Sequence, residues 1–254
     1  METEQHLNSM PAFFNAIHPA PVSAAFVTSN LIGYWDALPV NQGSPWPDLS
    51  PTYNNTGQTH NLNLANGAAF STLGGVDCLY LDGVNDRATY TNASYGASDT
   101  FYISTLLAFT HEYWIRSNGA WINDGNIYSA AFNSGSRSRF DSSGNLWFYN
   151  VGSLFGGNLG GSWATNTWHH LCVTMESLGA NDRFTVYKNG VQVGQDTTGN
   201  YAPTFAGPNF YLGTQDGSRE FARIGYGLGR RYNRALTSTE VSQNFNAEKA
   251  RFGY

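Results

Sequence analysis

The final stretch of the chain, ARIGYGLGRRYNRALTSTEVSQNFNAEKARFGY at residues 222–254, predicts a strand that passes directly into one short helix. Thr237 is a favourable N-cap residue, and Glu240 three positions later completes the pattern of a capping box. Leu236 before the cap and Val241 after it have the spacing of a hydrophobic staple. Because the preceding chain has the pattern of strands, we predict a single terminal helix on an all-β domain.

The composition favours short strands joined by many turns. The chain has 254 residues, of which 28 are glycine, and only 12% are charged. This length is enough for one large β-sandwich or two small domains. A net charge of −5 argues against a nucleic-acid partner, because a surface that binds nucleic acid carries a basic stripe. Cys78 and Cys172 are interpreted as buried free thiols, and a disulfide would require oxidising conditions.

Residues 109–116 alternate between two faces of a predicted strand. The face that holds Glu112, Trp114 and Arg116 is the more polar one, as expected for an antiparallel sheet with one wet side. Glu112 is therefore predicted to be a surface carboxylate that pairs with Arg116.

Asn189-Gly190 predicts a two-residue type I′ hairpin. Such a turn fixes the register of the strands on either side. The expected pairs are Lys188 with Val191, Tyr187 with Gln192, and Val186 with Val193.

Residues 1–29 differ from the rest, because they mix prolines, alanines and aromatic residues and no helix or strand period persists. We predict an extended N-terminal arm that lies on its own domain or on a partner subunit. The N-terminus lacks a signal-peptide pattern, and no apolar run is long enough for a membrane, so synthesis in a cytoplasm and no membrane partner are expected. The arm residues expected to contact the partner are Phe13, Phe14, Ile17 and Phe26.

The closing segment resembles the end of laminin-G-like, concanavalin A-like jelly-roll domains. Residues 232–237 (YNRALT) and 243–247 (QNFNA) carry the resemblance, and the ending Phe252-Gly253 is similar to versions found in tailed-phage structural proteins. The resemblance implies that residues 30–254 form a two-sheet antiparallel β-sandwich, a jelly roll with a short C-terminal helix. Further blocks follow the family's order at residues 79–86, 109–116, 168–174 and 187–190.

The resemblance also raises the question of catalysis, because this fold hosts glycanases. Such enzymes need two carboxylates placed on either side of a glycosidic bond. None of the seven glutamates has an aspartate two residues later, which is the spacing that would set the pair on one strand face. We therefore predict a protein that is not an enzyme and requires no cofactor.

Two kinds of ligand site are candidates. Asp82 and Asp86 lie near turns and could contribute to a Ca²⁺ site, together with Asp124 and Asp216, although aspartates at turns more often cap the backbone. Aromatic rings near the surface can stack on sugar rings, so Trp114 and Trp121, with Asp124, are the candidate carbohydrate-binding residues. The alternative for both tryptophans is a place in the core.

The favoured function is that of a phage virion structural protein made in the host cytoplasm. It would be a capsid decoration (cement) protein attached through its arm, with the major capsid protein and further copies of itself as partners. The alternative is a carbohydrate-binding receptor module of a phage tail or head fibre. A glycan-processing enzyme is the least favoured interpretation.

Overall fold

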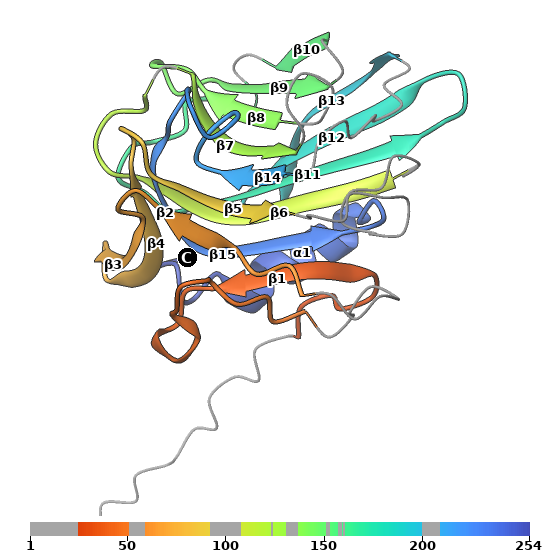
Figure 1. Ribbon diagram of the computed structural model, residues 1–254. Coiled ribbons are helices and arrows are strands. Elements are labelled where there is room, and N and C mark those ends of the chain that lie inside the picture. Colours follow the sequence, from red (N-terminus) through yellow and green to blue (C-terminus); the bar gives the residue numbers. More distant parts are fainter. Residues whose placement is uncertain are drawn as a thin grey trace, which may run out of the picture.

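A computed structural model describes residues 25–50, 59–91, 108–122, 124–130, 137–150, 153–156, 159, 161–199 and 209–254. These residues form two antiparallel β-sheets and one α-helix, with a 3-10 turn η1 at Pro39–Asn41 (Figure 1). No helix in the described ranges has the length and apolar character needed to cross a membrane. The predicted β-sandwich with a C-terminal helix is confirmed.

The larger sheet contains eight strands within the described part of the chain. β15 lies near its middle, between β6 on one side and both β4 and β1 on the other. In spatial order the strands are β13 (Val191–Gly199), β12 (Asp182–Lys188), β11 (His169–Ser177), β6 (Ala108–Ser117), β15 (Arg223–Tyr232), β4 (Val76–Asp82) and β3 (Ala69–Leu73), with β1 (Leu31–Asp36) paired to β15.

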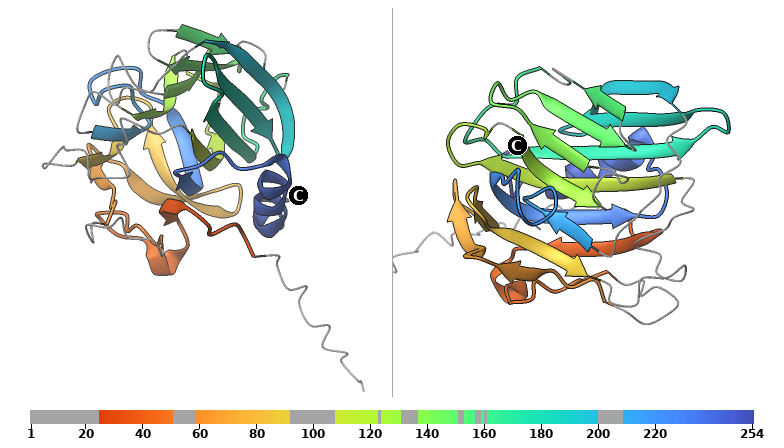
Figure 2. Two further views of the ribbon diagram at one scale, coloured as in Figure 1. Left: turned by 90° about the vertical axis from the view of Figure 1, so that its right-hand side faces the viewer. Right: turned by 45° about the horizontal axis from the view of Figure 1, so that its top comes forward.

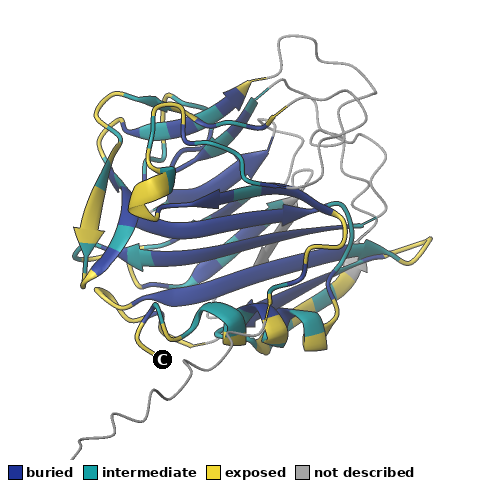
Figure 3. Cartoon of the chain, turned by 90° about the horizontal axis from the view of Figure 1, so that it is seen from below, coloured by how far each residue is buried: buried dark blue, intermediate teal, exposed yellow. Residues whose placement is uncertain are grey.

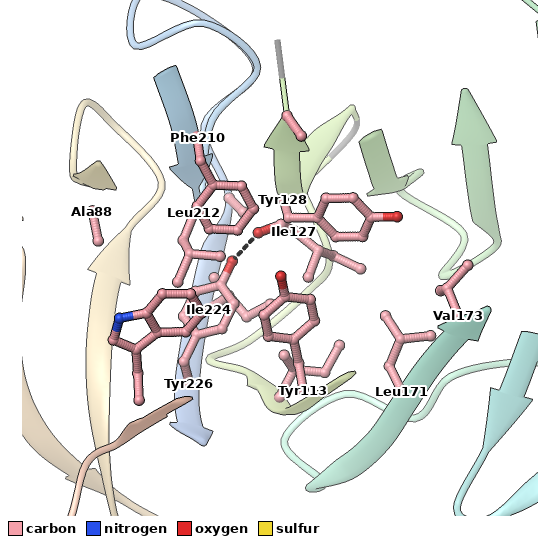
Figure 4. Close-up of a cluster of buried hydrophobic side chains, with 14 of the residues drawn as sticks. Ala88, Tyr113, Ile127, Tyr128, Leu171, Val173, Phe210, Leu212, Ile224 and Tyr226 are labelled. Atoms are coloured by element: carbon pink, nitrogen blue, oxygen red, sulfur yellow. Dashed lines mark hydrogen bonds between the residues drawn. The ribbon is translucent and has the colours of Figure 1, made fainter. Parts of the chain in front are cut away.

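The second sheet contains seven strands among the described residues. It packs face to face with the first, and the two inner faces enclose the main apolar core (Figure 4). The spatial order is β10 (Ser153–Gly156), β9 (Leu146–Asn150), β8 (Arg137–Phe140), β7 (Gly125–Ala130), β14 (Asn209–Leu212), β5 (Arg87–Thr91) and β2 (Asn63–Ala65).

On one side of β15, the paired strand changes from β4 to β1 at Gly227. The residues before this glycine pair with β4, and those after it pair with β1, while the register against β6 shifts at the same point. A Cβ atom on Gly227 would lie 2.4 Å from the ring of Phe252, so a larger residue would clash with the tail. Gly227 therefore permits both a bulge and a close contact with the tail.

Helix α1, Ser238–Glu248, covers the outer side of the eight-stranded sheet (Figure 2). It begins with the predicted capping box: Glu240 N donates to Thr237 Oγ1 at 3.3 Å, and Thr237 N donates to Glu240 Oε2 at 2.9 Å. Leu236 and Val241 join one buried cluster, as expected for a hydrophobic staple. The domain thus has three layers, namely two sheets and a helix.

The third layer buries both faces of β6, which corrects the expectation of one wet face. Phe109 and Tyr113 face the core between the sheets. Glu112 and Trp114 face α1 and the C-terminal tail, and both are fully buried. Figure 3 shows the long central strands mostly in dark blue, whereas exposed residues lie in turns, on helical segments and on outer strands.

Glu112 is the centre of a buried polar network rather than a surface partner of Arg116. His170 Nε2 lies 2.8 Å from Glu112 Oε1, and Arg230 Nη1 donates to the same oxygen at 3.3 Å. Asn244 Nδ2, on α1, donates to Glu112 Oε2 at 2.7 Å. Burial opposes ionisation of this carboxyl, but Arg230 and the hydrogen bonds from His170 and Asn244 outweigh it and lower its pKa. The network therefore ties α1 to β6, β11 and β15.

The Asn189-Gly190 hairpin has two of its three predicted pairs. Lys188 lies opposite Val191, and Tyr187 lies opposite Gln192. Val186 instead lies opposite Gly194, because the register shifts between Val186 and Tyr187. A bulge of this kind adds one residue to one strand, which the turn sequence does not encode. Cys78 and Cys172 are both buried and free, as interpreted from their contexts.

Candidate functional surface

The seven-stranded sheet directs a row of side chains away from the core. Strand pairing places Thr89, Tyr211 and Ser129 next to one another across β5, β14 and β7. The row continues through Arg137 on β8 to Tyr149 on β9. Because the flanking residues on each strand pack into the core, this row forms the outer face of the sheet.

A β-bulge in β7 creates a second outward row. Ile127 and Tyr128 are consecutive, yet both lie in the core, and the register shifts between Asn126 and Tyr128. The extra residue leaves Asn126 and Ser129 on the outer side. Asn126 then lies opposite Arg139, which in turn lies opposite Trp147 on β9.

Arginine and aromatic side chains pack together on this outer face. The guanidinium carbon of Arg137 lies 4.2 Å from the centroid of the Tyr149 ring, and that of Arg139 lies 4.8 Å from it. Arg139 also donates to the Tyr149 hydroxyl. Trp147 Nε1 donates to Asp141 Oδ2 at 2.9 Å. These contacts fix the rings of Trp147 and Tyr149 while both side chains remain partly exposed.

Two carboxylates from distant loops hold the arginines. Glu220 Oε2 accepts from Arg137 Nη1 at 2.9 Å and from Asn126 Nδ2 at 2.6 Å, and Asp124 pairs with Arg139. Both acidic residues have left-handed backbones, with φ values of +54° at Glu220 and +62° at Asp124. Such conformations are uncommon outside glycine, and they persist where the surroundings hold them in place. The local folding therefore fixes the arginines in position.

Three polar atoms on this outer face have no hydrogen-bond partner among the described residues. They are Thr89 Oγ1, Asn126 Oδ1 and Arg139 Nε, and all three are shielded from solvent. A buried polar atom without a partner costs about 1–3 kcal/mol, so native proteins rarely leave one unpaired. These atoms can be satisfied by water or by a ligand that enters the face.

Asp141 on this face is poorly suited to proton donation. Burial opposes ionisation of Asp141, but hydrogen bonds from Trp147 and Asn145 outweigh it and lower its pKa. A glycosidase acid needs the opposite shift. Glu220 and Asp124 are occupied by the arginines.

Asp82 and Asp86, which were predicted to contribute to a Ca²⁺ site, accept hydrogen bonds from backbone N–H groups at the turn between β4 and β5. Asp82 N donates to Asp86 Oδ2 at 3.0 Å, and Val84 N donates to Asp82 Oδ1 at 2.8 Å. Asp216 likewise accepts from Ser218 and Arg219 in its own loop. Within the described ranges, no cluster of three or more His, Cys, Asp or Glu side chains could hold a metal ion. The calcium site stays a prediction.

Both candidate tryptophans lie inside the domain. Trp114 is fully buried, and its ring stacks on Phe252 with centroids 4.1 Å apart. Trp121 is 7% exposed, stacks on Phe140 at 4.0 Å, and donates from Nε1 to Trp163 O at 2.7 Å. Neither ring offers a face to a sugar in solvent, which corrects the expectation that they could do so.

Asp124 does lie at the outer face of the seven-stranded sheet, where it contacts Arg139. Arg139, Trp147 and Tyr149 were not among the site residues predicted from the sequence. A signal for them was present, because residues 138–141 and 146–149 flank a hairpin-like turn. Their alternation would place these three side chains on one face.

The last part of the predicted arm packs on its own domain. Phe26 lies over the guanidinium group of Arg230, 3.9 Å from its central carbon, and its ring centroid is 5.2 Å from that of Tyr34. Val27 N donates to Asn244 Oδ1 at 2.7 Å. Residues 25–29 therefore belong structurally with the domain. Phe13, Phe14 and Ile17 lie outside the described residues.

Comparisons with known proteins agree with this architecture. A family model described as the concanavalin A-like lectin/glucanases superfamily matches residues 82–242. A search of curated proteins by sequence gives no match. Among solved structures, Trypanosoma rangeli sialidase has a TM-score of 0.61 at 18% identity, over 91% of this chain and 35% of that chain.

Two toxin domains are similarly related in fold. The binding domain of Paraclostridial Mosquitocidal Protein 1 has a TM-score of 0.63 at 17% identity, over 87% of this chain and 52% of that one. The receptor binding domain of botulinum neurotoxin C/D mosaic serotype has a TM-score of 0.62 at 12% identity, with the same coverages of 87% and 52%. The chain thus spans about a third to a half of these structures, and the likeness extends to the fold alone. Since both an enzyme and toxin binding domains share it, the fold does not decide between catalysis and binding.

Proposed function

The chain belongs to the concanavalin A-like lectin/glucanase superfamily, and we propose that it is a non-enzymatic glycan-binding domain. Its binding surface would be the outer face of the seven-stranded sheet. The observation that carries this proposal is the group of unpartnered polar atoms, Thr89 Oγ1, Asn126 Oδ1 and Arg139 Nε, beside the rings of Tyr149 and Tyr211.

The chemistry of this face suits a sugar. Aromatic rings offer apolar area to the C–H faces of a pyranose, while an amide oxygen, a hydroxyl and an N–H group can exchange hydrogen bonds with its hydroxyls. The strands and the ion pairs hold these groups in place before binding, which reduces the entropy lost on association. The two similar toxin structures are a binding domain and a receptor binding domain, which supports a binding role for this fold.

Replacement of Arg139 by alanine is expected to weaken glycan binding at least about tenfold, because the change removes a donor and releases both Tyr149 and Asp124. The purified chain is screened on a glycan array, and the best-retained glycan is then titrated by calorimetry. Arg116→Ala is the matched control, because Arg116 is also a partly exposed arginine but lies on β6 of the other sheet. Equal affinity of both variants and the parent would contradict the assignment, and so would an array that retains no glycan.

A second candidate function is that of a phage capsid decoration protein, attached through the residues that precede the domain. One observation favours it: hydrogen bonds from β15 and α1 hold the segment of residues 25–29 against the domain. Tyr232 Oη donates to Val27 O at 2.9 Å, and Gln243 Nε2 donates to Ala25 O at 2.7 Å. The described chain therefore begins beside the helix, on the opposite side of the sandwich from the seven-stranded sheet. Attachment there would leave the proposed glycan face free, and the major capsid protein and further copies of the chain would be its partners.

Deletion of residues 1–24 is expected to leave the melting temperature unchanged and to abolish attachment to capsids. Deletion of residues 1–29 is expected to lower the melting temperature as well, because it removes Val27 and Phe26 from their contacts on the domain. Calorimetry gives the stability, and sedimentation of capsids mixed with each variant gives the attachment. Normal decoration by the 1–24 deletion would rule out the attachment role.

A further inference from the structure

A groove of about 310 Å³ lies on the outer side of the eight-stranded sheet, beside the start of α1. Strand pairing sets Thr174, Thr185 and Gln195 next to one another across β11, β12 and β13, and these residues form its floor. The remaining lining comes from Glu176 and Arg183, from Tyr187 and Gln192, and from residues 235–238. The groove therefore lies on the opposite face of the sandwich from the proposed glycan surface.

The wall formed by residues 235–238 is fixed to the sheet. Thr110 Oγ1 accepts from Leu236 N at 3.0 Å and donates to Arg234 O at 2.8 Å. Arg234 also donates to both oxygens of Glu240, at 2.8 and 2.6 Å, and these bonds help to lower the pKa of that carboxyl to about 2. The floor of the groove is a β-sheet, and hydrogen bonds from Thr110 and between Arg234 and Glu240 hold its wall. The groove is therefore formed before any ligand binds.

The lining is polar without an uncompensated charge. Arg183 Nε donates to Glu176 Oε1 at 2.7 Å, so the two charged side chains neutralise each other. The other polar groups are hydroxyls and amides, which can both donate and accept. The side chains of Gln192 and Gln195 line the groove, and both residues are exposed. An anionic ligand would be repelled by Glu176, and a cationic ligand would be repelled by Arg183.

We propose that this groove binds one uncharged pyranose unit of a glycan. Ligand pockets have volumes of about 300–1,000 Å³, so this groove lies at the lower limit and suits a single ring. Hydroxyls and amides at its floor and rim match the alternating donors and acceptors of a pyranose. This site is independent of the surface proposed above and stands whether or not that surface binds a glycan.

The test is a titration of the full chain with the methyl glycosides of glucose, galactose and mannose, followed by amide chemical shifts. We expect saturable shifts in β11–β13 with at least one of the three. The affinity should fall at least tenfold in Thr185→Val, which removes the hydroxyl and keeps the shape, and in the exposed variant Gln195→Ala. It should be unchanged in Thr197→Val, a control at an exposed position on β13 outside the groove.

Three outcomes would overturn the proposal. One is the absence of saturable shifts up to about 50 mM, well above the ~1 mM dissociation constants of weak complexes. Another is binding that neither Thr185→Val nor Gln195→Ala weakens. The third is tighter binding of glucuronic acid or glucosamine than of any neutral glycoside, because it would show that the groove selects charge.

Discussion

Replacement of Glu112 by alanine is expected to lower the free energy of unfolding by about 3–5 kcal/mol, the usual cost of removing one partner from a buried ion pair. The carboxylate accepts from Arg230 and Asn244 and lies within hydrogen-bond distance of His170, and Glu112 and Arg230 have fully buried side chains. Without it, Arg230 keeps its charge inside the domain, and Glu248 is its one remaining acidic partner among the described residues. Guanidinium denaturation followed by tryptophan fluorescence measures the loss.

Glu176→Ala is the matched control for this prediction. Glu176 also pairs with an arginine, Arg183, but both side chains are more than a third exposed. An ion pair of this kind contributes about 0–1 kcal/mol. If the two variants lost the same small amount of stability, Glu112 would be a surface carboxylate, as its place in the sequence pattern suggested.

Replacement of Trp114 by alanine is expected to cost about 3–5 kcal/mol of stability, the range for a large aromatic side chain removed from a core. Its ring stacks on Phe252 and lies 5.6 Å from the centroid of Phe245, so the change opens a cavity between the sheet, the helix and the tail. Trp114→Phe should lose less because it keeps part of this stack. Denaturant unfolding of the two variants gives the difference.

The same Trp114→Ala variant separates a packing role from a role in sugar binding. The folded fraction should bind glycan with the affinity of the parent, because Trp114 lies under α1 and not on the seven-stranded sheet. A variant that kept its stability and lost glycan binding would contradict the buried position of the ring.

Local patterns were enough to predict the architecture. The Thr237–Glu240 capping box and the Asn189-Gly190 turn depend on residues close in sequence, and both form as predicted. The predicted pair of Val186 with Val193 was wrong because the register shifts at Val186. Such a shift depends on packing against the remaining sheet and not on the turn sequence. Alternation along β6 was also correct, but it does not tell which layer covers each face.

The candidate surface was harder to predict because its parts come from distant segments. Trp114 looked accessible because the strand pattern contains no information about α1, which follows more than 120 residues later. Arg139, Trp147 and Tyr149 could have been found from hairpin alternation. Glu220 and the bulge at Asn126 could not, since loop conformation and an inserted residue depend on tertiary contacts.

A hydrogen-exchange footprint of the chain with the glycan selected by the array tests directly where the glycan binds. We expect slower exchange in β7, β8 and β9, at residues 125–130 and 137–150, and we expect the Arg139→Ala variant to lose this protection. Bound glycan with no protection in these strands, or protection that Arg139→Ala leaves intact, would contradict the claim that the outer face of the seven-stranded sheet is the binding surface.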